Sequence, residues 1–171
     1  MTAYVALLRA VNVSGTGKLP MSELKAMGEA CGFRSVRTFI ASGNLLFESD
    51  DGEAVVQAKV EKKLEAFFGK HVPVFVRTAT EMAAVAANNP FGDEPSNRVV
   101  AHFIAEPPKQ SMIDAATGLN GERMALGARE IYIFYGEGMG TSKLKLPVFR
   151  AGTARNMNSV TKIAGLMADM E

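Results

Sequence analysis

Apolar positions in the first half of the chain change their period several times, and each change predicts a new element. Short β-rich runs indicate strands, whereas apolar side chains at a spacing of three and four indicate helices. In chain order we predict a strand at 3–9, a helix around 24–31, strands at 35–41 and 44–49, a helix at 52–68 and a strand at 72–78. This order of elements is that of the ferredoxin-like unit.

The second predicted helix has the clearest apolar face, with side chains that recur at helical spacing. This predicted stripe consists of Val56, Val60, Leu64 and Phe67. After the strand at 72–78, Thr78 and Glu81 have the spacing of a capping box, which predicts a further short helix.

A polar segment rich in Pro and Asn, "NNPFGDEPSN" at 88–97, divides the chain into two predicted halves, 1–90 and 91–171. The second half repeats strand, helix, strand and strand. Its predicted elements are a strand at 98–105, a short helix within 106–118, a hairpin of 122–126 and 130–136, a strand at 143–149 and a last helix near 157. No closing strand is evident from the sequence. The predicted fold is α+β, with two ferredoxin-like, βαββ-type halves that arose by internal duplication and antiparallel sheets packed with helices.

Composition limits the size and class of the protein. With 171 residues, the chain can form one compact domain or two small subdomains that share a core. An apolar fraction of 47% argues against disorder, and a net charge of +1 argues against a polycation that binds DNA in bulk. The distribution of charge is more informative, because residues 1–22, 30–47 and 138–168 contain no Asp or Glu. These three stretches predict local positive potential.

The single cysteine, Cys31, excludes an internal disulfide and agrees with a reducing compartment. The N-terminus lacks the basic segment of a signal peptide, and no apolar run reaches the length needed to span a membrane, so we expect a cytoplasmic protein. The two histidines, His71 and His102, are isolated in sequence. We therefore predict no metal site, no cofactor and no nucleophile–histidine pair; Cys31 and His102 are interpreted as packing residues.

Two glycine- and polar-rich segments near the C-terminus are the candidates for anion binding. "GEGMGTSK", at 136–143, lacks the Walker A spacing, but its glycines and Lys143 suit a looser anion contact or a plain surface loop. "GTARNMNSVTK", at 152–162, contains the predicted start of the last helix, near Met157. Its polar residues are expected either to cap that helix or to bind a phosphate or carboxylate at its N-terminus. Both interpretations stay open here.

The motifs "LLRAVNVSGTGKLPM", "TFIASGNLLF", "VRTATE", "TSKLKLP" and "GTARNMNSVTKIAGL" resemble a widespread bacterial family catalogued as domain of unknown function 1697. The resemblance implies two ferredoxin-like halves and brings no activity or cofactor. This chain has Ser14 where a glycine is frequent in the family, and Met157 where tryptophan is frequent. The candidate ligand-binding residues in these motifs are Arg9, Asn12, Ser42, Asn44, Ser142, Lys143, Thr153, Arg155, Asn156, Asn158 and Lys162.

These observations favour a cytoplasmic binding protein for a small anionic ligand, phosphorylated or nucleotide-like. One alternative is an enzyme that acts on such a ligand by positioning and electrostatics, with Lys143 as its base. The other is an RNA-binding module that uses aromatic side chains of the hairpins, namely Phe39, Phe47, Tyr132, Phe134 and Tyr135. The sequence leaves the catalytic residues, the ligand's identity and the oligomeric state open.

Overall fold

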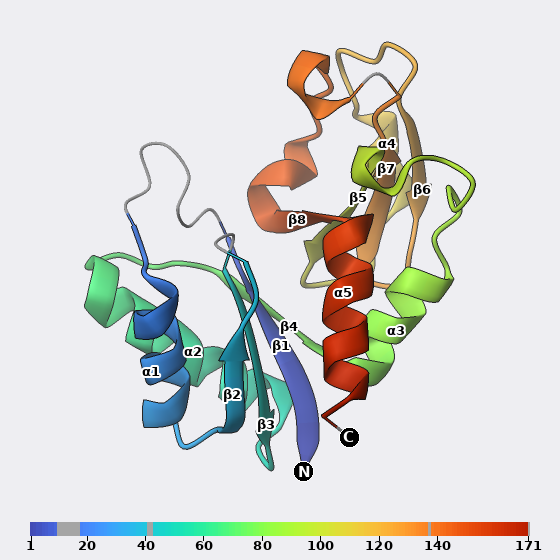
Figure 1. The fold of residues 1–171 in the computed structure, drawn as a ribbon. Coiled ribbons are helices and arrows are strands. Elements are labelled where there is room, and N and C mark those ends of the chain that lie inside the picture. The colour runs from blue at the N-terminus through green and yellow to red at the C-terminus, as the bar shows by residue number, and fades with distance from the viewer. Residues whose placement is uncertain (10–17, 41–42, 137, 171) are drawn as a thin grey trace. The chain divides into compact units, whose positions relative to one another are not determined.

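A computed structural model describes residues 1–9, 18–40, 43–136 and 138–170. The chain forms two compact units (Figure 1), one of residues 1–81 with 163–171 and the other of residues 82–162. None of the helices in the described residues is both long and apolar enough to cross a membrane.

The first unit contains a four-stranded antiparallel sheet in the order β2-β3-β1-β4. Its strands are β1 (Thr2–Leu8), β2 (Arg34–Thr38), β3 (Asn44–Ser49) and β4 (Val74–Thr78). Helices α1 (Met21–Ala30) and α2 (Glu53–Phe68) connect the strands and lie against the sheet (Figure 1). The predicted element order of this half is confirmed.

Alternation along the strands produces the core of the first unit. Every second residue of β1 faces the helices, so Tyr4, Ala6 and Leu8 join one buried cluster with residues of α1 and α2. Phe47 of β3 is fully buried there and stacks on Phe33, with ring centroids 4.0 Å apart.

The predicted apolar stripe of α2 is wrong at one position. Val56, Val60 and Leu64 are buried, but Phe67 is 43% exposed and Phe68 packs against the core instead. The row of contacts continues in steps of four from Leu64, which leads to Phe68 rather than Phe67. The helix ends at Gly69, whose φ of 71° is left-handed and favours glycine.

The second unit repeats the same sheet in the order β6-β7-β5-β8, again antiparallel throughout. Its strands are β5 (Val99–Ile104), β6 (Arg123–Leu126), β7 (Glu130–Phe134) and β8 (Gly152–Asn156). The helical elements are α4 (Gln110–Asp114) and the 3-10 turns η1 (Ser96–Arg98), η2 (Met139–Thr141) and η3 (Pro147–Ala151). The two similar halves confirm the α+β class and agree with a duplicated ferredoxin-like fold.

The closing strand of the second half lies at 152–156, inside the segment that the sequence assigned to a helix start. The strand predicted at 143–149 is wrong. These residues, all of them described, contribute a single β-bridge, from Lys145 to Thr117, before η3 begins at Pro147. Proline lacks the N–H that a longer ladder requires, and its fixed φ suits the first turn of a helix.

The fourth strands of the two halves share a local design. Arg77 of β4 pairs with Val5, Arg155 of β8 pairs with Ala101, and both arginines are buried. Each donates from Nη1 to the carbonyl of the preceding residue, at 2.8 Å and 2.9 Å. A helix begins two residues after each arginine, α3 (Ala79–Ala87) in one case and α5 (Met157–Ala168) in the other.

The two halves differ in how one face of the sheet is covered. In the first half, the connection from β3 to β4 is the long helix α2. In its described residues, the corresponding connection from β7 to β8 contains only the short turns η2 and η3. Leu144 and Leu146 of this connection pack on Ile131 and Ile133 of β7 and take over the covering role of α2.

The two phenylalanines Phe47 and Phe67 offer a matched test of this core. Replacing the buried Phe47 by alanine should lower the free energy of unfolding by about 3–5 kcal/mol, because it leaves a cavity beside Phe33. Phe67→Ala should cost less than about 1 kcal/mol, because that ring is 43% exposed and lies outside the buried core cluster. Urea unfolding followed by circular dichroism measures both, and equal losses would contradict the assigned packing of α2.

Candidate functional site

Two of the predicted binding residues of the first unit lie among the described residues, and their contacts are with the backbone of their own unit. Arg9 is half-buried and its backbone N–H donates to Pro73. Asn44 is fully buried, and its side-chain amide donates to the carbonyl of Phe39 at 2.7 Å, which holds the turn of the β2–β3 hairpin. The predicted contacts of Asn12 and Ser42 lie outside the described residues.

Arg155, the central cation of the motif at 152–162, points away from solvent. Alternation in β8 puts Thr153 and Arg155 on one face, and both are buried. The Arg155 Nη1 atom donates to Thr153 Oγ1 at 2.8 Å and to the Ala154 carbonyl at 2.9 Å. Burial lowers the pKa of Arg155 to about 10, so the guanidinium is still charged at neutral pH.

The other polar residues of this motif serve the start of α5. The side-chain oxygen of Asn156 accepts the backbone N–H of Ser159 at 2.9 Å, which is the bond of a helix N-cap. The Asn158 amide oxygen accepts a hydrogen bond from the Ser96 hydroxyl. Lys162 lies one turn further along and is exposed. The cap interpretation therefore explains Asn156, and the strand explains Thr153 and Arg155.

Ser142 connects two loops of the second unit. Its hydroxyl donates to Glu122 Oε2 at 2.9 Å and accepts the backbone N–H of Leu144 at 3.2 Å. The pKa of Glu122 is lowered by the backbone N–H of Asn120 and then by the Ser142 hydroxyl. The carboxylate is consequently a weaker base than an ordinary glutamate. Lys143, next in the chain, is exposed.

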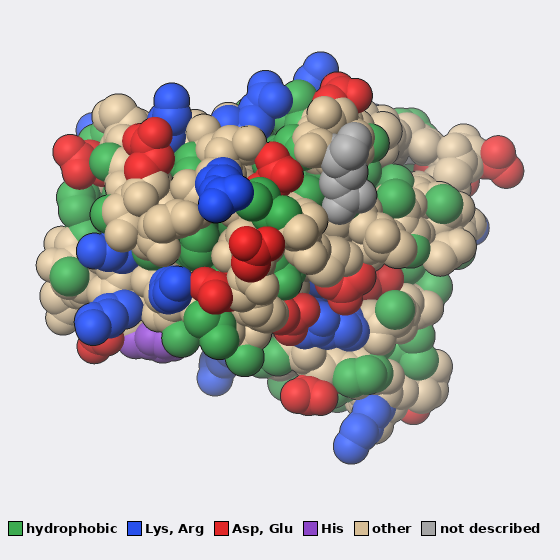
Figure 2. Space-filling model, turned by 90° about the horizontal axis from the view of Figure 1, so that it is seen from below, with side chains coloured by type: hydrophobic (Ala, Val, Ile, Leu, Met, Phe, Trp, Pro, Cys, Tyr) green, Lys and Arg blue, Asp and Glu red, His purple; other side chains and the backbone are tan. Residues whose placement is uncertain are grey.

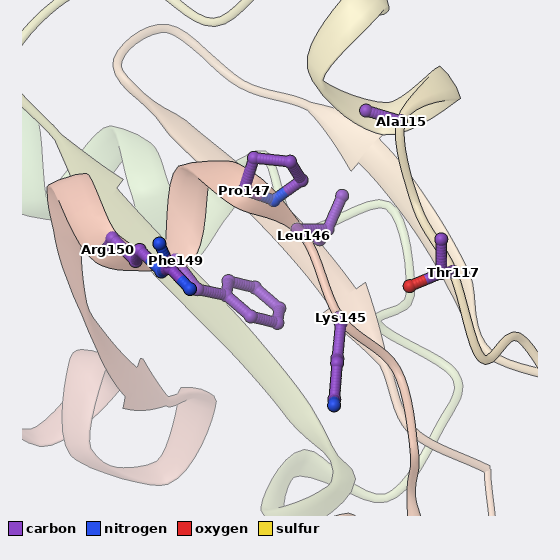
Figure 3. A pocket seen from close by; sticks show the side chains of 7 residues that line it. All are labelled: Ala115, Thr117, Lys145, Leu146, Pro147, Phe149 and Arg150. Carbon is purple, nitrogen blue, oxygen red and sulfur yellow. The ribbon is translucent and has the colours of Figure 1, made fainter.

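A pocket of about 520 Å³ lies beside these loops, within the second unit. Its size is in the range of small-molecule sites. The seven residues that line it (Figure 3) are Ala115, Thr117, Lys145, Leu146, Pro147, Phe149 and Arg150. Figure 3 shows the ring of Phe149 projecting towards the space between Leu146 and Lys145, with Ala115 and Thr117 on the opposite side.

The pocket lies between two segments of the second unit that are joined by the β-bridge between Thr117 and Lys145. Thr117 and Lys145 exchange two backbone hydrogen bonds, of 2.9 Å and 2.8 Å. Residues alternate about this bridge, so Leu144 and Leu146 are buried while the side chain of Lys145 is exposed. The η3 turn then places Phe149 and Arg150 along the same wall.

His102 of β5 packs against the η3 turn, which forms one wall of the pocket. Its Nε2 lies 3.2 Å from the carbonyl of Val148, and its ring meets the ring of Phe149 edge-on at 5.1 Å. His102 is buried, as expected for a packing residue. A side chain at Gly152 would collide with His102 and with the carbonyl of Phe103, so this close approach requires glycine.

Charge distinguishes the pocket from its surroundings. Of the described residues that line it, none is acidic, and Lys145 and Arg150 are both exposed cations. On the face shown in Figure 2, basic and acidic side chains are interspersed. Neither Lys145 nor Arg150 was among the predicted binding residues. The signal that could have identified them is the acid-free stretch 138–168 together with the alternating pattern Lys-Leu-Lys-Leu at 143–146.

Two side-chain environments bear on the alternative functions. Phe47 and Tyr132, two of the five aromatics considered for RNA stacking, are buried, and the Tyr132 hydroxyl donates to Val85 at 2.8 Å. Phe39, Phe134 and Tyr135 are half-buried.

The environment of Cys31 bears on the enzyme alternative. Burial raises the pKa of the Cys31 thiol, and this effect is larger than the opposite effect of Lys63 and Lys59. The thiol is therefore protonated and a poor nucleophile.

Comparisons with known proteins place the fold. A family model described as "Protein of unknown function (DUF1697)" matches residues 1–132, which include Ala115 and Thr117 but end before Lys145. A solved structure of a conserved bacterial protein from Streptococcus pneumoniae is similar, with a TM-score of 0.80 and 24% sequence identity over 98% of this chain and 99% of that chain. The comparison with curated proteins finds no match.

The cap assigned to Asn156 can be tested without any ligand. Asn156→Ala should lower the free energy of unfolding by about 1 kcal/mol, because the N–H of Ser159 loses its acceptor. Thr161→Ala, at an exposed position of the same helix, is the control and should change the free energy of unfolding by less than about 0.5 kcal/mol. Urea unfolding measures both; an unchanged stability of Asn156→Ala would refute the cap.

The link between Ser142 and Glu122 predicts a shift in acidity. Ser142→Ala should raise the pKa of Glu122 part of the way towards its ordinary value, since the larger contribution, from the Asn120 N–H, is retained. Carbon-detected NMR titration of the carboxyl group measures this shift. Thr141→Ala removes a neighbouring hydroxyl that donates to Gly138 and should leave the Glu122 pKa unchanged. A Glu122 pKa that does not respond to Ser142→Ala would contradict the assigned bond.

Proposed function

The chain belongs to the family described as "Protein of unknown function (DUF1697)", and from the chemistry of its pocket we propose that it binds a small anionic ligand. The ligand is phosphorylated or nucleotide-like and lies beside Lys145 and Arg150. We further propose that the protein does this in the bacterial cytoplasm, where its single cysteine stays reduced.

One observation carries this proposal: two cations share a pocket whose described lining residues include no carboxylate. Lysine and arginine favour anions, and arginine adds the forked geometry that matches phosphate and carboxylate oxygens. Internal acidic partners would neutralise such cations. The ion pairs found in the described residues, such as Arg123 with Glu94 at 2.9 Å, lie elsewhere and involve neither Lys145 nor Arg150.

The pocket supports the same ligand class that the sequence suggested, but with different residues. Arg155 and Asn44 are buried, and their hydrogen bonds go to their own strand and hairpin, so they are less suited to bind a ligand than Lys145 and Arg150. The supporting features are the acid-free stretch 138–168 and the exposure of both cations.

Binding rather than catalysis is proposed because the described residues that line the pocket include no carboxylate, histidine or cysteine. These are the side chains that most often act as general bases or nucleophiles. The aromatics considered for RNA binding include the buried Phe47 and Tyr132, which are unavailable for stacking in this conformation.

The test uses methyl phosphate and adenosine 5′-monophosphate as probes in NMR titrations. Lys145→Ala and Arg150→Ala should each weaken binding about three- to tenfold, because each removes a charged hydrogen-bond donor from the pocket. Added salt should weaken binding as well. Lys143→Ala is the matched control: it removes the same charge from an exposed position two residues away that does not line the pocket.

The control separates the pocket from the sequence motif. If Lys143→Ala weakened binding as much as Lys145→Ala, the anion would lie along the Ser142-Lys143 loop and the pocket assignment would be wrong. Binding of neither probe, with no chemical-shift change at Lys145 or Phe149, would reject the proposed function.

A further inference from the structure

The apolar part of the pocket indicates what the anion is attached to. Besides its two cations and Thr117, the pocket is lined by Ala115, Leu146, Pro147 and Phe149. Leu146 is only 4% exposed and belongs to the core cluster of the second unit, so it gives the pocket a fixed apolar base. A bare anion would leave this surface in contact with water, whereas a ligand with an apolar group would cover it.

Phe149 is positioned for contact with a flat group. Its ring packs at 61° against the ring of His102, with the ring centroids 5.1 Å apart, and the neighbouring carbonyl, that of Val148, lies 3.2 Å from His102 Nε2. The ring is therefore held from one side, while it is half-buried and lines the pocket on the other. A ring fixed in this way loses little side-chain entropy on binding and offers its free surface for stacking or edge contact.

The number of cations limits the charge of the ligand. Lys145 and Arg150 can balance the two negative charges of a phosphate monoester. A triphosphate would bring further charges, and the described lining residues contain neither another cation for them nor a carboxylate that could hold a magnesium ion beside them. Two exposed cations beside a largely apolar wall match one phosphate joined to one apolar group.

We infer that the ligand is a monophosphate ester that carries an aromatic ring, with the phosphate at Lys145 and Arg150 and the ring against Phe149 and Leu146. This inference rests on the proposed function and narrows it. The volume of about 520 Å³ accommodates a ligand of this kind.

The experiment compares phenyl phosphate with methyl phosphate, which carry the same phosphate and differ in the apolar group. On the wild-type protein, phenyl phosphate should bind about tenfold more tightly, because the additional carbons leave water. In Phe149→Leu the ratio should fall to about threefold or less, because phenyl phosphate loses the contact between its ring and that of Phe149. In Lys145→Ala both ligands should weaken by a similar factor, and in Lys143→Ala neither should.

A second measurement does not depend on a variant that packs against His102. In the wild-type protein, intermolecular nuclear Overhauser contacts should connect the phenyl protons of the ligand to the side chains of Phe149 and Leu146. Equal affinities for the two esters, or ring contacts elsewhere, would overturn the aromatic assignment and leave the anion site standing. If neither ester binds, the proposed function itself fails, and this inference fails with it.

Discussion

The apolar face of each four-stranded sheet has to be shielded from water, and the two halves meet this requirement by different means. In the first half the shield includes α2, with Val56, Val60 and Leu64 in one continuous row. In the second half an irregular segment supplies Leu144 and Leu146 instead. This irregular cover meets the segment after α4 at the bridge between Thr117 and Lys145, and the pocket lies between the two segments. The pocket is thus a consequence of how the second sheet is covered.

The buried arginines illustrate the cost of placing charge inside such a fold. A guanidinium removed from water requires hydrogen-bond acceptors nearby, and Arg77 and Arg155 each use the carbonyl of the residue before them. The residue after each arginine caps the next helix, Thr78 for α3 and Asn156 for α5. The same sequence of strand, arginine, cap and helix in both halves is stronger evidence of internal duplication than residue identity, because it repeats a physical solution.

Local sequence patterns predicted most helices and strands, but they did not predict contacts between residues that are far apart in the sequence. The periodicity of α2 and the capping box of Thr78 and Glu81 are properties of a few neighbouring residues, so they were recognisable in the sequence. The hydrogen bond from Ser142 to Glu122 joins residues that are 20 positions apart, so a short sequence pattern does not indicate it. The segment 152–156 was misjudged because its polar residues were assigned to the start of the last helix, although they form a strand whose alternation turns Arg155 inward. The pocket joins residues from 115 to 150, and its sequence signals are limited to the acid-free stretch 138–168 and the alternating Lys-Leu-Lys-Leu pattern at 143–146.

The backbone bridge between Thr117 and Lys145 fixes the walls of the pocket independently of the side chains that line it. Both of its hydrogen bonds run between backbone atoms, so they do not depend on which side chains occupy these positions. Ala115, Thr117 and Lys145 can therefore be exchanged while the two walls keep their separation, and the sheet beneath stays covered by Leu144 and Leu146. For the proposed anion site, such a frame leaves three positions at which side chains can be changed to alter ligand preference without moving the walls of the pocket.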